Sequence, residues 1–429
     1  MKKIISGISK KNKIDTKKVF LTFVIINFII FCISIFISDG AAFAKLFYLR
    51  QSDSFMDFFN SILFTLSKNV SAYQDTGVIY PPLAYLIFGL FGRLIPGSNY
   101  MDAFQLRESQ MGQISILLFT VVCILAMFYL LYRYFDGKEH EKLIFISALL
   151  FSAPLLFLIE RGNILLLVLA LITAYITLMD SKNPVLREIS LICLALAAGI
   201  KIYPAILGLM LIFDKKYSAA VRCLIYGIVF FIVPFFFFGG FNTIPVFIHN
   251  ITNEISSVPF AFDWLFSRAD LASMLAVPYY MVRGTLDGCE HFARILSFII
   301  TGQLLLGSFL FKEKWLKLLC LTIIMVVLPS FNSTYILVFY FLPLTLFLSK
   351  KESSSFDPFH VILFIMIIAP IAFGNIYSLG YFSLSQLSSM IAQLLLILIL
   401  FIRVLKYEYV WVVSSFEKRK HKPLQQTNP

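Results

Sequence analysis

Two aspartates in an otherwise apolar stretch have the spacing of an acid–base pair. Asp53 and Asp57 lie in the segment Asp-Ser-Phe-Met-Asp-Phe-Phe-Asn at 53–60, and four residues of separation place them one helical turn apart. A carboxylate in a partly dry cleft has a raised pKa and can take a proton from a hydroxyl group. Aspartates in loops are more often solvated or helix-capping residues, so the pair indicates a general base only in combination with other features.

Two cations stand at the ends of hydrophobic runs. Arg161 lies in Glu-Arg-Gly-Asn at 160–163 and Lys201 in Lys-Ile-Tyr-Pro at 201–204. A helix that crosses a membrane and a second that returns use roughly forty residues at ~1.5 Å per residue, so both cations should emerge on the same face. Together they would form a phosphate site. The alternative is that each side chain extends separately to lipid headgroups.

The composition shows what must position these residues. Of 429 residues, 59% are hydrophobic and 14% are charged, against about 25% charged in a typical soluble domain. A chain of this kind cannot cover a surface exposed to water, and about 20 apolar residues are needed for each membrane-spanning helix. We therefore expect an all-α fold, a polytopic transmembrane helical bundle.

The hydrophobic runs predict about twelve spans, with a long outer loop at 39–110 that carries interfacial helices. One of these helices should follow Tyr-Pro-Pro-Leu at 80–83, and the segment near 271–280 could dip into the membrane. The first run is too long for a signal peptide and is read as an uncleaved span. The predicted spans are residues 19–38, 111–131, 143–159, 163–179, 189–200, 204–213, 223–238, 291–311, 318–329, 335–348, 361–376 and 384–402.

The basic residues predict the topology. With both termini in the cytoplasm, 26 of the 36 Lys and Arg residues fall on the cytoplasmic side, as the positive-inside rule requires. The net charge of +12 thus reports membrane orientation, and no nucleic-acid partner is expected. The prediction is a multi-pass protein of the cytoplasmic membrane with membrane lipid around it. Ten basic residues remain outside: Lys45, Arg50, Lys68, Arg93, Arg107, Arg161, Lys201, Arg268, Arg283 and Arg294.

We expect a single membrane domain over residues 1–429. Its parts are a basic cytoplasmic N-terminus (1–18), a catalytic module (19–213), a second helical half (214–402) and a basic cytoplasmic tail (403–429). The six cysteines show neither CxxC pairs nor disulfide spacing. No cofactor is identified, although a divalent cation could assist the carboxylates.

The order of these motifs resembles glycosyltransferase family 87, a member of the GT-C superfamily of multi-spanning enzymes. The resemblance rests on Asp-Phe after the first span (57–58), Tyr-Pro-Pro-Leu (80–83), Glu-Arg-Gly-Asn (160–163) and Lys-Ile-Tyr-Pro (201–204). It covers roughly residues 18–213, and the second half resembles the family in hydropathy alone.

The resemblance implies a transfer reaction and roles for the residues. An inverting enzyme of this kind moves a hexose from a polyprenyl-phosphate donor to a lipid or glycan acceptor on the extracytoplasmic face. Asp57 would be the general base, with Asp53 as second choice, and Arg161 and Lys201 would hold the donor phosphate. The residues expected to position the sugar are Tyr73, Tyr80, Asn163 and Tyr203. Related mannosyltransferases carry histidines in a late outer loop, whereas residues 329–335 contain none, so mannose is one candidate among hexoses.

Two other classes fit some of these features. A transporter or flippase of lipid-linked sugars would also need outer cations, but it should show polar residues along a path through mid-membrane, and the spans are nearly free of them. A noncatalytic membrane scaffold would leave Asp57, Arg161 and Lys201 on one face by chance.

Overall fold

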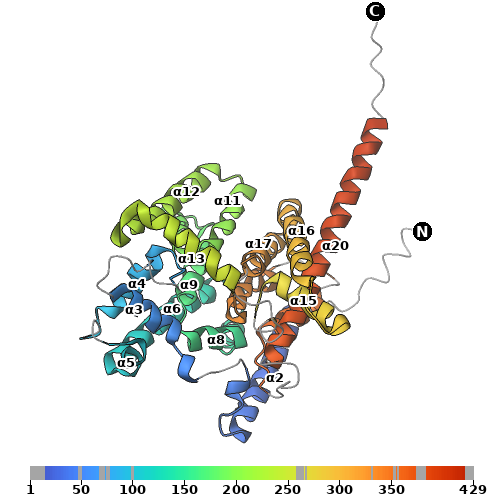
Figure 1. Cartoon of the computed structure of the whole chain (residues 1–429). Helices are drawn as coiled ribbons and strands as arrows, with labels where there is room; N and C mark the ends of the chain where they lie inside the picture. Colours follow the sequence, from blue (N-terminus) through green and yellow to red (C-terminus); the bar gives the residue numbers. More distant parts are fainter. Residues whose placement is uncertain are drawn as a thin grey trace, which may run out of the picture.

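The computed structural model describes residues 15–46, 51–66, 73, 78–97, 101–257, 265, 268–329, 332–350, 354, 357–372 and 383–420. Almost all of them are helical (Figure 1). One isolated bridge, between Arg268 and Ser333, is the sole β pairing in the described part of the chain. The expected all-α fold class is confirmed.

The helices form two groups that lie side by side. Helices α3 to α13 make up one group, while α15 to α20 and the N-terminal α2 make up the other (Figure 1). The first group contains α3 (Met56–Leu66), α4 (Pro82–Gly92), α5 (Ala103–Glu108), α6 (Gln110–Tyr134), α7 (Glu139–Leu150), α8 (Ala153–Arg161), α9 (Leu165–Leu178), α10 (Pro184–Ile200), η5 (Tyr203–Gly208), α11 (Leu209–Phe213), α12 (Tyr217–Ile232), η6 (Val233–Phe238), η7 (Gly240–Asn242) and α13 (Thr243–Ser257).

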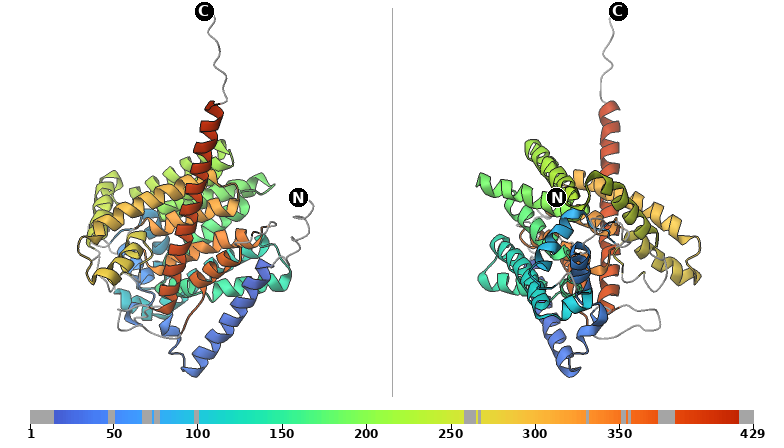
Figure 2. Two further views of the ribbon diagram at one scale, coloured as in Figure 1. Left: turned by 90° about the vertical axis from the view of Figure 1, so that its right-hand side faces the viewer. Right: turned by 60° about the vertical axis from the view of Figure 1, so that its left-hand side comes forward.

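The second group begins the chain and also ends it. Its α2 packs against α7 and α19, and the C-terminal part of α20 projects beyond the other helices (Figure 2). This group contains α2 (Thr16–Ile37), α15 (Leu271–Arg283), α16 (Cys289–Leu310), α17 (Lys314–Val327), η8 (Thr334–Tyr340), α18 (Phe341–Leu348), α19 (Asp357–Ile368) and α20 (Leu384–Lys420). Two short turns, η1 (Phe43–Lys45) and η2 (Gln51–Asp53), connect the groups.

Each of the twelve predicted spans overlaps a helical segment, although residues 373–376 of the predicted span 361–376 lie outside the described residues, and fewer helices are long enough to cross a membrane alone. Five of the described helices qualify by length and composition, or six if α7 and α8 form one span. These two helices, predicted as a single span at 143–159, meet at 52°. Pro154 in the first turn of α8 explains the break, because proline lacks the N–H that would continue the hydrogen bonds of α7. The count of twelve crossings stays a prediction.

Helix α10 delivers Lys201 to a backbone break. It begins at Pro184, whose missing N–H costs nothing in the first turn, and Asn183 caps it by accepting the Val185 N–H at 2.9 Å. It ends at Ile200 because Pro204 has no N–H to donate to the Ile200 carbonyl. Lys201 therefore follows the last residue of the helix in an extended conformation.

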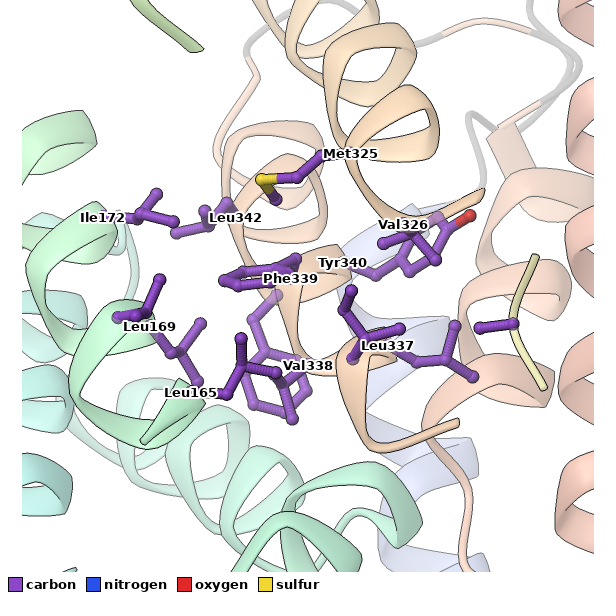
Figure 3. Packing of buried hydrophobic residues seen from close by; sticks show 14 of the residues in the cluster. Leu165, Leu169, Ile172, Met325, Val326, Leu337, Val338, Phe339, Tyr340 and Leu342 are labelled. Atoms are coloured by element: carbon purple, nitrogen blue, oxygen red, sulfur yellow. The ribbon is translucent and has the colours of Figure 1, made fainter. Parts of the chain in front are cut away.

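The surface and the core have the composition expected in lipid. Large apolar side chains are exposed along α12, including Val221, Leu224 and Ile228, and similar faces occur on α2 and α6. Packing inside is dense: η8 lies between α9 and α17, with Phe339 and Leu337 among their aliphatic side chains (Figure 3). One continuous cluster of buried residues thus joins the two groups of helices.

The packing predicts a contrast between two leucines. Leu169 in α9 is 0% exposed and Leu125 in α6 is 64% exposed. Leu169→Ala should lower the free energy of unfolding by about 2 to 5 kcal/mol, because its cavity has no partner atoms to fill it. Leu125→Ala removes a side chain from the exposed surface and leaves no internal cavity, so the free energy of unfolding should change little. Thermal unfolding of both variants in one detergent tests this, and equal losses would contradict the assigned core.

Candidate active site

The site is built around Arg161, the last residue of α8. Its guanidinium forms ion pairs with the carboxylates of both Asp53 and Asp57, through NH1 and NH2 respectively. NH1 also donates to the Asp53 carbonyl oxygen at 3.4 Å. The side chains of Arg161 and Asp57 are only 20% and 18% exposed. An unpaired charge shielded from water in this way would destabilise the fold, and the ion pair avoids that cost. The structure brings together the two aspartates and one of the two cations that the sequence predicted.

Backbone geometry holds the two segments together. Gly162 ends α8 in the left-handed region, with φ of 62°, and turns the chain directly after Arg161. The opposing loop contains Phe55, whose φ is 63° and whose N–H donates to the Glu160 carbonyl at 2.7 Å. The Ser54 hydroxyl donates to the Glu160 carboxylate at 2.7 Å. These contacts set the position of Asp53 and Asp57 relative to α8.

A further anchor comes from α5. Arg107 donates to the carbonyl oxygens of Ser52 and Ser54 at 3.1 and 3.3 Å. The sequence predicted Arg107 only as an outer basic residue, and it identified no role for Glu160. Both residues clamp the backbone that carries the aspartates.

Asn163 orients the carboxylate of Asp57. Its side-chain oxygen accepts the Leu165 N–H at 3.0 Å at the start of α9. That bond fixes the amide so that Nδ2 faces the other way, where it donates to Asp57 Oδ2 at 2.7 Å and to the Tyr80 hydroxyl at 3.2 Å. Asp57 therefore has one oxygen on Arg161 and the other on Asn163.

Lys201 occupies the same neighbourhood without a carboxylate partner in the described part of the chain. Its Nζ lies 3.8 Å from the centre of the Tyr80 ring, a cation–π contact. Burial lowers the pKa of Lys201 to about 7, and the charge of Asp57 opposes that shift.

The predicted tyrosines fall into two sets. Tyr80 lies in the site and stacks on Tyr85 with ring centres 5.8 Å apart. Tyr73 is buried among aromatic rings, and its hydroxyl donates to the Tyr80 carbonyl at 2.6 Å. It supports the backbone of Tyr80 and does not itself contact the carboxylates.

The sequence prediction missed Tyr335, which belongs to the same neighbourhood as Asp57 and Arg161. The charges of Asp57 and Arg161 both act on the Tyr335 hydroxyl, and Tyr335 in turn acts on Tyr203. Tyr203 packs its ring against Phe339 with centres 6.3 Å apart. Tyr335 stood in the loop noted for its lack of histidine, and its polar neighbours Asn332, Ser333 and Thr334 in an apolar region were the available signal.

The arrangement suits proton abstraction next to an anion. It offers an oriented carboxylate, a guanidinium that is paired with that carboxylate, and a lysine that forms no ion pair with the described residues. Among the described residues, no three His, Cys, Asp or Glu side chains are placed to hold a metal ion. Arg161 is the cation that bridges the two carboxylates in this structure.

Comparison with known proteins identifies one family. The model of glycosyltransferase family 87 matches residues 78–330, more than half of the chain. The match extends further into the second half than the sequence motifs did, and it starts after Asp53 and Asp57. Searches of curated proteins and of solved structures returned no match.

Gly162 provides a test of the site's geometry. A Cβ there would lie 3.0 Å from Ile116 Cδ1 and 3.1 Å from Phe58 Cβ, at a positive φ. Gly162→Ala should destabilise the protein by about 1 to 3 kcal/mol and displace Arg161 from Asp57. The control is Gly227→Ala in α12, where a Cβ meets nothing within 4 Å. The test compares the melting temperatures of the two variants in one detergent. If Gly162→Ala melts at the same temperature as Gly227→Ala, glycine is not required at position 162.

Proposed function

Since the chain belongs to glycosyltransferase family 87, we propose that it moves a hexose from a polyprenyl-phosphate donor to a lipid or glycan hydroxyl, with inversion at the anomeric carbon. The observation that carries the proposal is Asp57, an oriented carboxylate near the half-buried ammonium group of Lys201, which forms no ion pair with the described residues. Family membership makes the chain a transferase enzyme, which sets aside the transporter and scaffold readings.

Asp57 acts as the general base. The acceptor hydroxyl gives its proton to Asp57, and its oxygen forms a bond to the anomeric carbon of the donor sugar. The bond from that carbon to the phosphate oxygen breaks, and its electron pair leaves with the polyprenyl phosphate. Arg161 and Asn163 each hold one carboxylate oxygen of Asp57, so little reorganisation is needed when the proton moves.

Lys201 binds the donor phosphate and stabilises the negative charge that grows on it. Arg161 assists: a guanidinium has five N–H donors, and its contacts with the aspartates use NH1 and NH2, which leaves Nε for a phosphate oxygen. Lys201 is thus the main phosphate ligand, and Arg161 couples the phosphate to the base. Tyr80, Tyr203 and Asn163 line the space for the sugar.

The active site faces the extracytoplasmic side in this proposal. Asp57, Arg161 and Lys201 lie together at the ends of α8 and α10 that the twelve-span topology places outside, and the basic N- and C-terminal segments lie inside. A lipid-linked donor can reach this site from within the membrane.

Replacing the base tests the proposal. Asp57→Asn should keep the fold and lower the transfer rate by about 10²- to 10⁴-fold, the usual cost of losing a general base. Asp53→Asn is the matched control, because Asp53 contacts the same guanidinium but is 49% exposed. The measurement is hexose transfer by purified protein in lipid. If Asp53→Asn lost as much activity as Asp57→Asn, or if Asp57→Asn stayed active, the assignment of the base would be wrong.

The pKa of Lys201 leads to a prediction of how kcat/KM for the donor depends on pH. A pKa of about 7 means that the free enzyme carries the charged lysine below pH 7 and loses it above. The value of kcat/KM for the donor should therefore fall as the pH rises through about 7. Lys201→Arg should remove this alkaline fall, since guanidinium stays charged.

The matching loss-of-charge variant separates binding from stability. Lys201→Gln should raise the donor KM about ten- to hundred-fold, the size of one charge-assisted hydrogen bond, and leave the acceptor KM nearly unchanged. Arg93→Gln, at an exposed cation after α4, is the control and should alter neither. Identical donor curves for Lys201→Gln and the parent would exclude the phosphate role.

A further inference from the structure

A cavity with charged and apolar walls lies at the opposite end of the bundle from the aspartates. It has a volume of about 920 Å³ and is bounded by the start of α17, the end of α18, the start of α19 and the middle of α20. Helix α17 runs from this cavity toward the loop before Tyr335, and its 14 residues span about 20 Å. The cavity is therefore separate from the candidate active site by most of a membrane's thickness.

Three cations of this cavity are held in place by the fold. Lys350 pairs with the buried Asp357 at 2.5 Å, and its Nζ lies 5.1 Å from the Trp315 ring centre. Arg403 pairs with Glu313 at 3.3 Å. Lys314 also lines the cavity and forms an ion pair with Asp180 beside it.

The fourth cation has no such neighbour. Lys406 lines the cavity from α20 and is exposed, and no ion pair joins it to the described residues. Four cations and two carboxylates line the cavity, and the Asp180 that pairs with Lys314 also pairs with Lys216, so the described lining has an excess of positive charge. That excess favours an anionic ligand.

The rest of the lining is apolar. Leu346, Ile399, Ile402 and Val410 line the walls together with the Trp315 and Tyr407 rings. Walls of this kind would repel a free inorganic anion but can cover the upper part of acyl chains, and aromatic rings are typical of the headgroup level of a membrane. Helix α20 leaves the body just beyond this region (Figure 2).

We propose that this cavity binds one anionic phospholipid, with the headgroup phosphate on Lys406 and Arg403 and the acyl chains along Ile399 and Ile402 of α20. Lys350 and Asp357 form its inner wall. The positive-inside rule accounts for cations at this end of the bundle. It does not account for their convergence on a cavity with aromatic and aliphatic walls. The site would bind lipid from the leaflet opposite to the candidate active site.

Trp315 in the wall allows a direct test. In a full-length chain with Trp264→Phe and Trp411→Phe, Trp315 is the one remaining tryptophan. The protein is placed in vesicles that mix phosphatidylcholine with brominated phosphatidylglycerol, and in the reverse mixture, so that bromine quenching reports which lipid lies against Trp315. Phosphatidylglycerol should be preferred about fivefold or more, since one nearby Lys or Arg is worth about that factor.

Variants that each remove one positive charge test whether the cavity causes the preference for phosphatidylglycerol. Lys406→Gln should reduce the preference about fivefold, and Arg403→Gln should reduce it as well. Lys182→Gln removes an exposed cation before α10 at the same end of the bundle and should leave the preference unchanged. Equal quenching by both lipids in the parent would overturn the proposal, as would an equal reduction in the Lys182→Gln variant.

Discussion

Arg161 carries its charge at the end of an apolar helix, and the neutralisation of that charge organises the site. A guanidinium that is four-fifths shielded must be paired, and the nearest available carboxylates belong to Asp53 and Asp57, more than a hundred residues earlier. Two residues in left-handed conformation, Gly162 and Phe55, let the two backbones approach. The remaining contacts of the site, from Asn163 to Tyr80, follow from where this pairing places Asp57.

The same pairing explains why Lys201 differs from Arg161. Arg161 ends α8 and Lys201 follows α10 at the same site, yet the two carboxylates are already paired with the guanidinium. The lysine is left over an aromatic ring, with burial holding its pKa near 7. A site with one satisfied and one unsatisfied cation can bind a single anion without losing the orientation of its base. In the proposed reaction, this division of roles makes phosphate binding and proton abstraction compatible within one small space.

The sequence predicted the helices well because hydropathy and proline positions determine them locally. Helix lengths also predicted that Arg161 and Lys201 would emerge on the same face, and the family resemblance added Asp57 to them. The sequence prediction missed the direct pairing of Arg161 with the aspartates, because no local pattern records a contact across a hundred residues. Tyr335 was missed for the same reason. So was the role of Tyr73 as a support for Tyr80, which depends on the packing of Tyr73 against four other aromatic rings.

The most direct test of the account is the stereochemistry of a single reaction by the purified full-length protein. Polyprenyl-phosphate hexoses of known anomeric configuration are supplied in vesicles with a lipid-linked hydroxyl acceptor, and the product is analysed by NMR. If Asp57 deprotonates the acceptor and Lys201 holds the leaving phosphate, the product carries the opposite anomeric configuration to the donor, with polyprenyl phosphate released in equal amount. A product with the donor's configuration, or transfer from a nucleotide sugar without any polyprenyl-phosphate donor, would contradict the account.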